Sequence, residues 1–203
     1  MENLDMKRKI ELRIKRLFDI TVSVIGLFVL SPILLITMLL IKITMPGKIF
    51  FKQERVGKDK KIFYIWKFRT MKEDEKAERS HDFSKDMERM TRTGAILRRL
   101  KIDELPQLLN VLIGDMSLIG PRPTIIEQVE QYNEFQLLRL HMLPGMTGLA
   151  QVNGNIALSW EERILYDVKY IREFSILLDL SILFKTVLVV IFGERKFIKE
   201  CKK

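Results

Sequence analysis

The stretch ITVSVIGLFVLSPILLITMLLI, residues 20–41, contains no charged side chain and decides how the chain is arranged. As a straight α-helix it would be about 33 Å long, which is enough to cross the hydrocarbon core of a bilayer. A cleavable signal peptide is a poor fit, because the apolar run is too long and no small-residue cleavage site follows it. A soluble helix that is apolar on all faces would be unusual in a protein of 203 residues. We therefore expect residues 20–41 to enter a membrane.

Basic residues flank this segment at both ends and constrain its topology. The cytoplasmic side of a membrane is enriched in Lys and Arg, and both flanks of the segment fit that side. A single straight span cannot place both flanks there. The basic residues that precede and follow the segment are Lys7, Arg8, Lys9, Arg13, Lys15 and Arg16, then Lys42, Lys48, Lys52, Arg55, Lys58, Lys60 and Lys61.

Ser31-Pro32, near the middle of the segment, offers a way to reconcile the two flanks. Proline removes one helical hydrogen bond and bends a helix, and the serine hydroxyl could satisfy the carbonyl that is freed. A kinked ordinary span and a re-entrant hairpin both remain open, since proline is common in membrane helices. The charge symmetry favours the hairpin, so we place the break of the membrane helix at Ser31 and Pro32.

The remainder of the chain predicts one compact domain with little β-structure. Alternating residues at 49–55 and 61–70 indicate a hairpin, and a charged loop or loose helix is expected over 72–92. Helices are expected over 93–101 and 124–142, with a short extended piece at 117–123 and a loop plus strand at 145–154. We expect a capping box from Ser159 to Glu162, and a helix over 176–192 that lies in the membrane interface and leads into a basic tail, 195–203.

The predicted fold class is α+β. It comprises a re-entrant helix-break-helix hairpin in the membrane and a compact, mostly helical cytosolic domain with a small β element and interfacial amphipathic helices. The expected divisions are a basic N-terminal segment (1–16), the membrane hairpin (17–43) and a catalytic domain (44–203), with the interfacial helix and basic tail at its C-terminal end.

Composition narrows the class of partner and metal. The net charge of +9 implies an anionic partner, which could be nucleic acid, an acidic membrane or a phosphorylated substrate. The single cysteine, Cys201, excludes an internal disulfide, and two histidines without cysteine companions make a structural zinc site improbable. A bound metal is therefore expected to be magnesium or manganese on oxygen ligands.

Asp103 and Glu104 stand side by side before the helical run that follows Pro106. A helix N-terminus offers unpaired N–H groups and the positive end of a dipole, which favours an ionised Asp103. Asp103 could cap the helix, hold a divalent cation or act as a nucleophile. A plain cap is the commonest of these roles for a lone aspartate.

Five phrases in the expected order resemble those of the bacterial sugar transferases, and more narrowly the monotopic phosphoglycosyl transferases that begin lipid-linked glycan assembly. They are KRLFDI (15–20), the mid-membrane Ser31-Pro32, KFRTM (67–71), IDELPQLLNVLIGDMSLIGPRP (102–123) and PGMTGLAQVNG (144–154). Each phrase alone would be weak, but the set covers nearly the whole chain. The chain resembles the small form of this family.

The resemblance implies transfer of sugar-1-phosphate from a UDP-sugar to undecaprenyl phosphate, with release of UMP. It makes Asp103 the nucleophile, forming a covalent aspartyl-phosphosugar intermediate, and a ligand of Mg²⁺. It gives Glu104 a part in proton handling or metal positioning. A carboxylate that attacks a pyrophosphate meets strong repulsion, so basic side chains and the metal must stabilise the charge.

Further site residues follow from their places in the matched motifs. Lys67, Arg98 and Arg122 are candidate phosphate ligands, since Arg can donate two hydrogen bonds to one phosphate. Gln151 and Asn153 could bind the uracil or the sugar, although loop contacts fit them equally well.

The expected partners are the UDP-sugar, undecaprenyl phosphate and anionic membrane lipids, with no nucleic acid. A homo-oligomer or an association with downstream glycosyltransferases is compatible with the sequence. The expected location is the cytoplasmic face of the bacterial inner membrane. Two alternatives remain: a non-catalytic membrane-bound scaffold and a membrane-tethered nucleic-acid-binding regulator. The second lacks helix-turn-helix or zinc spacing.

Overall fold

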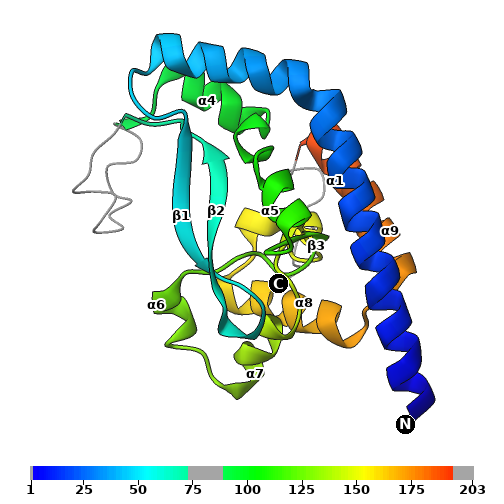
Figure 1. Cartoon of the computed structure of the whole chain (residues 1–203). Coiled ribbons are helices and arrows are strands. Elements are labelled where there is room, and N and C mark those ends of the chain that lie inside the picture. Colours follow the sequence, from blue (N-terminus) through cyan, green and yellow to red (C-terminus); the bar gives the residue numbers. More distant parts are fainter. Residues whose placement is uncertain (1, 73–88, 194–203) are drawn as a thin grey trace.

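The computed structural model describes residues 2–72 and 89–193 of the chain. The basic tail expected over 195–203, and most of the charged segment expected over 72–92, lie outside these residues. A long bent helix, α1 (Glu2–Thr44), forms one edge of the molecule, and most of the other elements lie inside its bend (Figure 1). Within the described residues, one helical stretch, Met6–Thr44, is long and apolar enough to cross a membrane.

The predicted helix break is a bend within a single continuous helix. Pro32 lies inside α1, and Figure 1 shows that the N-terminal and C-terminal portions of the helix run in different directions. Proline lacks the N–H that would bond the carbonyl of Phe28, four residues earlier. The Ser31 hydroxyl donates to that carbonyl at 2.7 Å, as the sequence predicts for a freed carbonyl. Residues 2–16 of the expected basic segment belong to the same helix.

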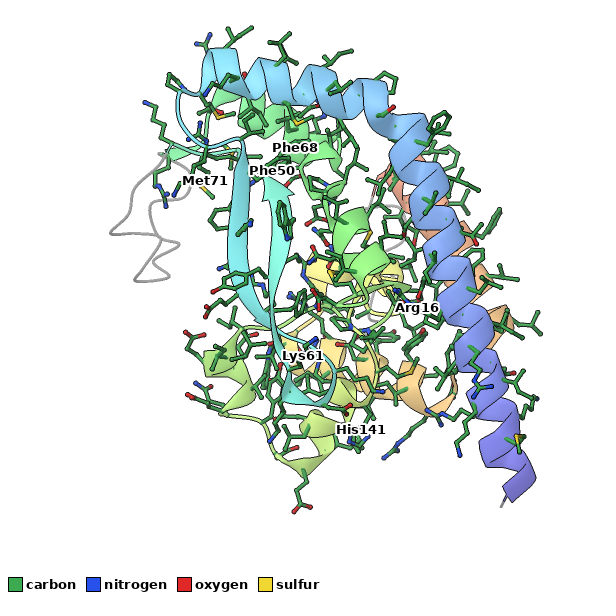
Figure 2. The ribbon with its side chains drawn as sticks, viewed as in Figure 1. Arg16, Phe50, Lys61, Phe68, Met71 and His141 are labelled. Atoms are coloured by element: carbon green, nitrogen blue, oxygen red, sulfur yellow. The ribbon has the colours of Figure 1, made fainter. Side chains whose placement is uncertain are left out.

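Polar contacts fasten the first half of α1 to the domain. Lys15 Nζ lies 2.6 Å from Asp179 Oδ2, and the Leu118 N–H donates to Asp19 Oδ1 at 3.0 Å. Arg16 donates to the main-chain carbonyls of Val111 and Leu112 at 2.6 and 2.9 Å. Figure 2 shows Arg16 on the side of α1 that faces the domain. These contacts involve buried or half-buried groups, so this end of α1 is an integral part of the domain.

The other end of α1 packs on a different part of the same domain. Ile41 and Met45 are buried in a cluster with Phe68 and Leu97. The middle of α1 also touches the domain, since Leu108 approaches within 3.3 Å of where a Cβ on Gly26 would lie. The opposite face of α1 exposes large apolar side chains: Val24, Ile25, Phe28, Val29, Ile33, Leu35, Ile36, Leu39, Leu40 and Ile43.

The predicted hairpin is confirmed. Strands β1 (Phe50–Val56) and β2 (Ile62–Phe68) are antiparallel, with Phe50 opposite Phe68 and Val56 opposite Ile62. The phenyl rings of Phe50 and Phe68 stack near the C-terminal end of α1 (Figure 2). The turn at Gly57 continues into a single 3-10 turn, Lys58–Lys60.

Short elements connect the hairpin to the last two helices. They are α4 (Arg92–Arg99), α5 (Gln107–Ile113), β3 (Ser117–Ile119), α6 (Ile126–Val129), α7 (Glu134–Leu137), β4 (Gly145–Thr147), α8 (Trp160–Arg172) and α9 (Ile176–Phe192). Strands β3 and β4 pair in parallel. The main apolar core lies between α1, α5, β2, β3, α8 and α9. The expected α+β class and the helix at 176–192 are confirmed.

The single helix predicted over 124–142 is wrong. The chain instead forms α6, α7 and a 3-10 turn, Leu138–His141. The Asn133 side chain accepts from the Gln136 N–H and starts a new helix with a capping box. The break allows Tyr132 to be buried, and its hydroxyl hydrogen-bonds to Arg139. By contrast, the capping box predicted from Ser159 to Glu162 is present at the start of α8.

Candidate active site

Asp103 and Glu104 lie in a single 3-10 turn, Ile102–Glu104, directly before Pro106 and α5. Lys101 adopts a left-handed conformation (φ 59°), which turns the chain sharply out of α4 into this turn. Neither the 3-10 turn nor α5 receives a side-chain cap. Asp103 therefore does not act as a plain helix cap, although it is buried, with 7% of its surface exposed.

The charge environment of Asp103 differs from the one expected at a helix end. Burial raises the pKa of Asp103, and repulsion from Glu104 raises it further. The positive charges of Lys67, Arg98 and Lys101 offset only part of this rise. The net effect is a pKa above the usual aspartate value, because the loss of solvent outweighs the nearby positive charges.

The pKa of Glu104 shifts in the opposite direction, because Glu104 pairs with a cation. Lys67 Nζ donates to Glu104 Oε1 at 2.7 Å. Burial alone would raise the pKa of Glu104, but the charge and hydrogen bond of Lys67, with the charges of Arg122 and Lys101, lower it below its usual value. The pKa values of the two neighbouring carboxyl groups are thus shifted in opposite directions. This pattern is typical of sites in which neighbouring groups take separate acid, base or nucleophilic roles.

A small cavity of about 40 Å³ adjoins the Glu104 side of the pair. Its walls come from separate parts of the chain: Lys67 from β2, Glu104 from the 3-10 turn, Arg122 from the loop after β3, and Gln151 from the turn after β4. The structure thus brings together four residues that the sequence predicted for the site. With Arg55, which also lines this cavity, three basic side chains and one carboxylate share it.

Arg98 and Asn153, which the sequence also predicted for the site, lie away from this cavity. Arg98 is exposed on α4, and its Nε donates to Thr70 Oγ1 at 3.0 Å, while its charge acts on Asp103. Asn153 donates to the Leu149 carbonyl at 2.7 Å, as a loop-stabilising contact would. Neither residue lines the cavities described here. Gln151 donates to the Met146 carbonyl, and its buried Oε1 has no hydrogen-bond partner among the described residues.

The loop that carries Arg122 is held through its main chain. The Gly145 N–H donates to the Pro121 carbonyl at 2.8 Å, and Arg139 Nη2 donates to the Arg122 carbonyl at 2.9 Å. Arg139 is itself fixed by a buried ion pair with Asp167, with Nη2 and Oδ2 2.6 Å apart. These contacts occupy the backbone of the loop and leave the Arg122 guanidinium without a hydrogen bond to any described residue.

A larger cavity of about 230 Å³ continues from the small one. Arg55, Arg122, Pro123 and Gln151 line both cavities, so they form the junction between them. Burial and repulsion from Arg122 lower the pKa of Arg55 to about 10, with Glu127 opposing the shift. Two guanidinium groups therefore face a shared space in which an anion would relieve their repulsion.

The described residues contain no group of three or more His, Cys, Asp or Glu side chains that could hold a metal. Magnesium does not need such a cage, because it is commonly bound through one or two carboxylates together with substrate phosphates. Asp103 and Glu104 supply two adjacent carboxyl groups, and a cation near them would relieve the repulsion that raises the pKa of Asp103. The donor set fits a substrate-assisted magnesium site.

Comparison with known proteins identifies the family. The bacterial sugar transferase family matches residues 10–193. The chain belongs to this family. It is 44% identical over 181 residues to a protein of Bacillus subtilis described as the uncharacterized sugar transferase EpsL, and the match covers 89% of each chain. This membership confirms the resemblance inferred from the five motifs.

Two further members of the family have names that specify an activity. One is the UDP-glucose:undecaprenyl-phosphate glucose-1-phosphate transferase of Klebsiella pneumoniae, 44% identical over 85% of this chain and 39% of the relative. The other is the UDP-N-acetylgalactosamine-undecaprenyl-phosphate N-acetylgalactosaminephosphotransferase of Aeromonas hydrophila, 42% identical over 89% of this chain and 44% of the relative. The chain therefore spans less than half the length of these two relatives.

Sequence reasoning missed several residues around the larger cavity. Arg55 was counted only among the basic residues that flank the membrane segment, yet it lines both cavities. Its position in an alternating strand gave no signal of a site. Arg139 and Asp167 were missed as well, although a basic and an acidic residue in otherwise apolar surroundings are a recognisable sign of a buried pair.

Proposed function

We propose that the chain transfers sugar-1-phosphate from a UDP-sugar to undecaprenyl phosphate and releases UMP. The observation that carries this proposal is the buried Asp103 beside the Lys67–Glu104 ion pair, next to a cavity that Arg122 also lines. A carboxyl group with a raised pKa is a stronger nucleophile once ionised, and the neighbouring cations suit a phosphoryl substrate. The names of the Klebsiella and Aeromonas relatives support the same reaction class.

The proposed reaction has two displacements at one phosphorus atom. An Asp103 carboxylate oxygen attacks the phosphorus that carries the sugar, and the bond from that phosphorus to the bridging oxygen breaks, so UMP leaves with the bonding electrons. A phosphate oxygen of undecaprenyl phosphate then attacks the same phosphorus, and the aspartyl bond breaks to restore Asp103. Two steps let a soluble and a membrane-bound substrate use the site in turn.

Side chains of this chain stabilise charge around the reacting group. Lys67 holds Glu104 ionised, Arg122 presents a guanidinium to the cavity, and the charge of Arg98 acts on Asp103. Mg²⁺ held by Asp103 and Glu104 with the substrate phosphates would supply Lewis-acid neutralisation of the diphosphate. Glu104 then serves as an orienting group whose own charge is fixed by Lys67.

We further propose that α1 enters and leaves the membrane on the cytoplasmic face of the inner membrane. Its two ends contact the same domain: Lys15 and Asp19 bind α9 and β3, while Ile41 and Met45 pack with Phe68 of β2. A straight span would separate these contacts across the bilayer. The bend at Pro32 and the exposed apolar face of α1 support a re-entrant arrangement.

The experiment is UMP release by the full chain in lipid nanodiscs with undecaprenyl phosphate, magnesium and a panel of UDP-sugars that includes UDP-glucose and UDP-N-acetylgalactosamine. Asp103→Asn should reduce the release by about a thousandfold or more, because the nucleophile is lost. The matched control is Asp115→Asn, which removes a carboxylate from the same segment, where it pairs with Lys61 at 3.6 Å.

The control should retain activity within about twofold of the wild type, as a surface ion pair contributes little. An Asp103→Asn variant that still releases UMP would overturn the nucleophile assignment. Absence of UMP release by the wild type with every UDP-sugar of the panel would count against the transferase itself.

A further inference from the structure

Arg55 and Arg122 stand at the junction of the two cavities, although they come from distant parts of the chain. Arg55 belongs to β1, and Arg122 belongs to the loop after β3. Both line the 40 Å³ cavity beside Glu104 and the 230 Å³ cavity beyond it. An anion placed at this junction would meet two guanidinium groups, each able to donate two hydrogen bonds to phosphate oxygens.

The hydrogen bonds and charges of the two arginines at the junction favour the binding of such an anion. Arg55 Nη2 donates to Gln53 Oε1, a neutral acceptor, and the Arg122 guanidinium has no hydrogen bond to any described residue. Burial lowers the pKa of Arg55 most, and repulsion from Arg122 lowers it further, while Glu127 opposes the shift. Arg55 is half-buried and Arg122 is exposed, and the carboxylates that act on them are those of Glu127 and Glu104. A bound diphosphate would relieve the repulsion that remains between the two guanidinium groups.

The larger cavity has a volume and a lining that suit a nucleoside. Its volume of about 230 Å³ is below the range of about 300–1,000 Å³ typical of pockets that hold a whole drug-sized ligand, so it suits one part of a nucleotide sugar. Trp160 supplies an aromatic wall, and its ring lies 5.6 Å from that of Tyr132. Gln128 and Asn155 place amide groups in the lining. Aromatic faces and amides are the groups that stack on bases and read their edges.

We propose that Arg55 and Arg122 clamp the diphosphate of the nucleotide substrate, with the nucleoside in the larger cavity and the sugar-bearing phosphate directed toward Glu104 and Asp103. This inference rests on the proposed function and adds to it a residue, Arg55, and an orientation. The order of the two cavities sets the direction of the substrate. The nucleoside lies in the larger cavity, the diphosphate lies between Arg55 and Arg122, and the sugar-bearing phosphate lies toward Asp103 and Glu104. Undecaprenyl phosphate, by contrast, has no nucleoside, so it makes no use of the larger cavity.

The test measures binding of uridine, inorganic pyrophosphate and UDP to the full chain in nanodiscs by titration calorimetry with magnesium present. Arg55→Gln should weaken UDP and pyrophosphate at least tenfold and change uridine less than twofold. Gln128→Phe, which fills part of the larger cavity, should weaken UDP and uridine at least tenfold and leave pyrophosphate within twofold. The opposite selectivities of the two variants distinguish lost binding groups from lost folding.

The matched control is Lys52→Gln, which removes one positive charge from the same strand at an exposed position over the Trp66 ring. It should change all three affinities less than twofold. Equal losses for Lys52→Gln and Arg55→Gln would show that only net charge matters, and would overturn the clamp. Unchanged binding of UDP and pyrophosphate to Arg55→Gln would overturn it as well.

Kinetics separate this inference from the proposed function. If the wild type releases UMP and Arg55→Gln raises the KM for the UDP-sugar but not for undecaprenyl phosphate, both stand. If Arg55→Gln releases UMP with an unchanged KM for the UDP-sugar, the clamp is wrong and the transferase stands. If the wild type binds UDP with the predicted selectivity but releases no UMP, the clamp stands and the proposed function is wrong.

Discussion

Removing the carboxylate of Asp167 should destabilise the protein strongly. Asp167 is 2% exposed, and its Oδ2 lies 2.6 Å from Nη2 of Arg139, whose side chain is 7% exposed. In Asp167→Ala the guanidinium remains buried without its counter-charge. Arg139 keeps two neutral acceptors, the Tyr132 hydroxyl and the Arg122 carbonyl, so part of its hydrogen bonding survives.

The size of the loss follows from these contacts. Breaking a buried ion pair by removing one partner costs about 3–5 kcal/mol, and the two remaining acceptors place this case near 3 kcal/mol. For a chain of this length each kcal/mol lowers the midpoint of thermal unfolding by about 2–4 °C, which gives a fall of about 6–12 °C. The measurement is thermal unfolding of the full chain in nanodiscs.

The control variant is Asp167→Asn, which keeps a hydrogen-bond acceptor for Arg139 but removes the charge. Its cost should be about 1 kcal/mol, because the buried guanidinium stays hydrogen-bonded and the desolvation of the carboxylate is avoided. A midpoint for Asp167→Ala within 2 °C of the wild type, or equal losses in both variants, would refute the argument that the lost hydrogen-bond acceptor of the buried guanidinium determines the cost.

The pH dependence of the same variants has a defined sign. Burial raises the pKa of Asp167 to about 6, despite the charge and hydrogen bond of Arg139. Because this folded-state value lies above that of the unfolded chain, the protonated carboxyl group favours the folded state. The stability that this pKa shift contributes is therefore fully present below about pH 4 and is lost as the pH rises through about 6. The stability of Asp167→Asn relative to the wild type should rise over the same interval.

Two further predictions concern the architecture. Asn110→Ala should lower the free energy of unfolding, measured by chemical denaturation, by about 2–4 kcal/mol. The Asn110 side chain accepts from the Trp66 N–H and donates to the Tyr64 carbonyl of β2, and both groups would lose their partner. A loss below about 1 kcal/mol would contradict this prediction. For topology, Lys7→Cys and Lys61→Cys, each with Cys201→Ser, should react with an impermeant maleimide in inside-out vesicles and not in intact cells, and labelling from opposite sides would exclude the re-entrant arrangement.

Much of the architecture was predictable where local rules decide. The hairpin, the capping box at Ser159 and the helix Ile176–Phe192 follow from alternation, cap chemistry and apolar length, all of which act within a few residues. The helix predicted over 124–142 failed because burial of Tyr132 and capping by Asn133 divide it. The Asn133 cap is a local signal like the one at Ser159, whereas the burial of Tyr132 depends on what lies opposite the segment in space.

The candidate site shows the same division. Motifs placed Lys67, Glu104, Arg122 and Gln151 in the site, and the structure brings them to one cavity. Arg55 lies outside the five motifs, and only the packing of β1 against the loop after β3 places it beside Arg122. A pairing between residues so far apart in the chain leaves no local pattern.

By itself, the sequence determined the family, the membrane segment with its bend at Pro32, and the identity of the acidic pair. The tertiary structure decided the acidity of that pair: Asp103 loses solvent and its pKa rises, while Lys67 reaches Glu104 from a different strand and lowers its pKa. Two adjacent carboxylates with the same intrinsic chemistry thus become different groups. The physical reason is that burial and the distance to a counter-charge depend on packing in space, which residue order does not contain.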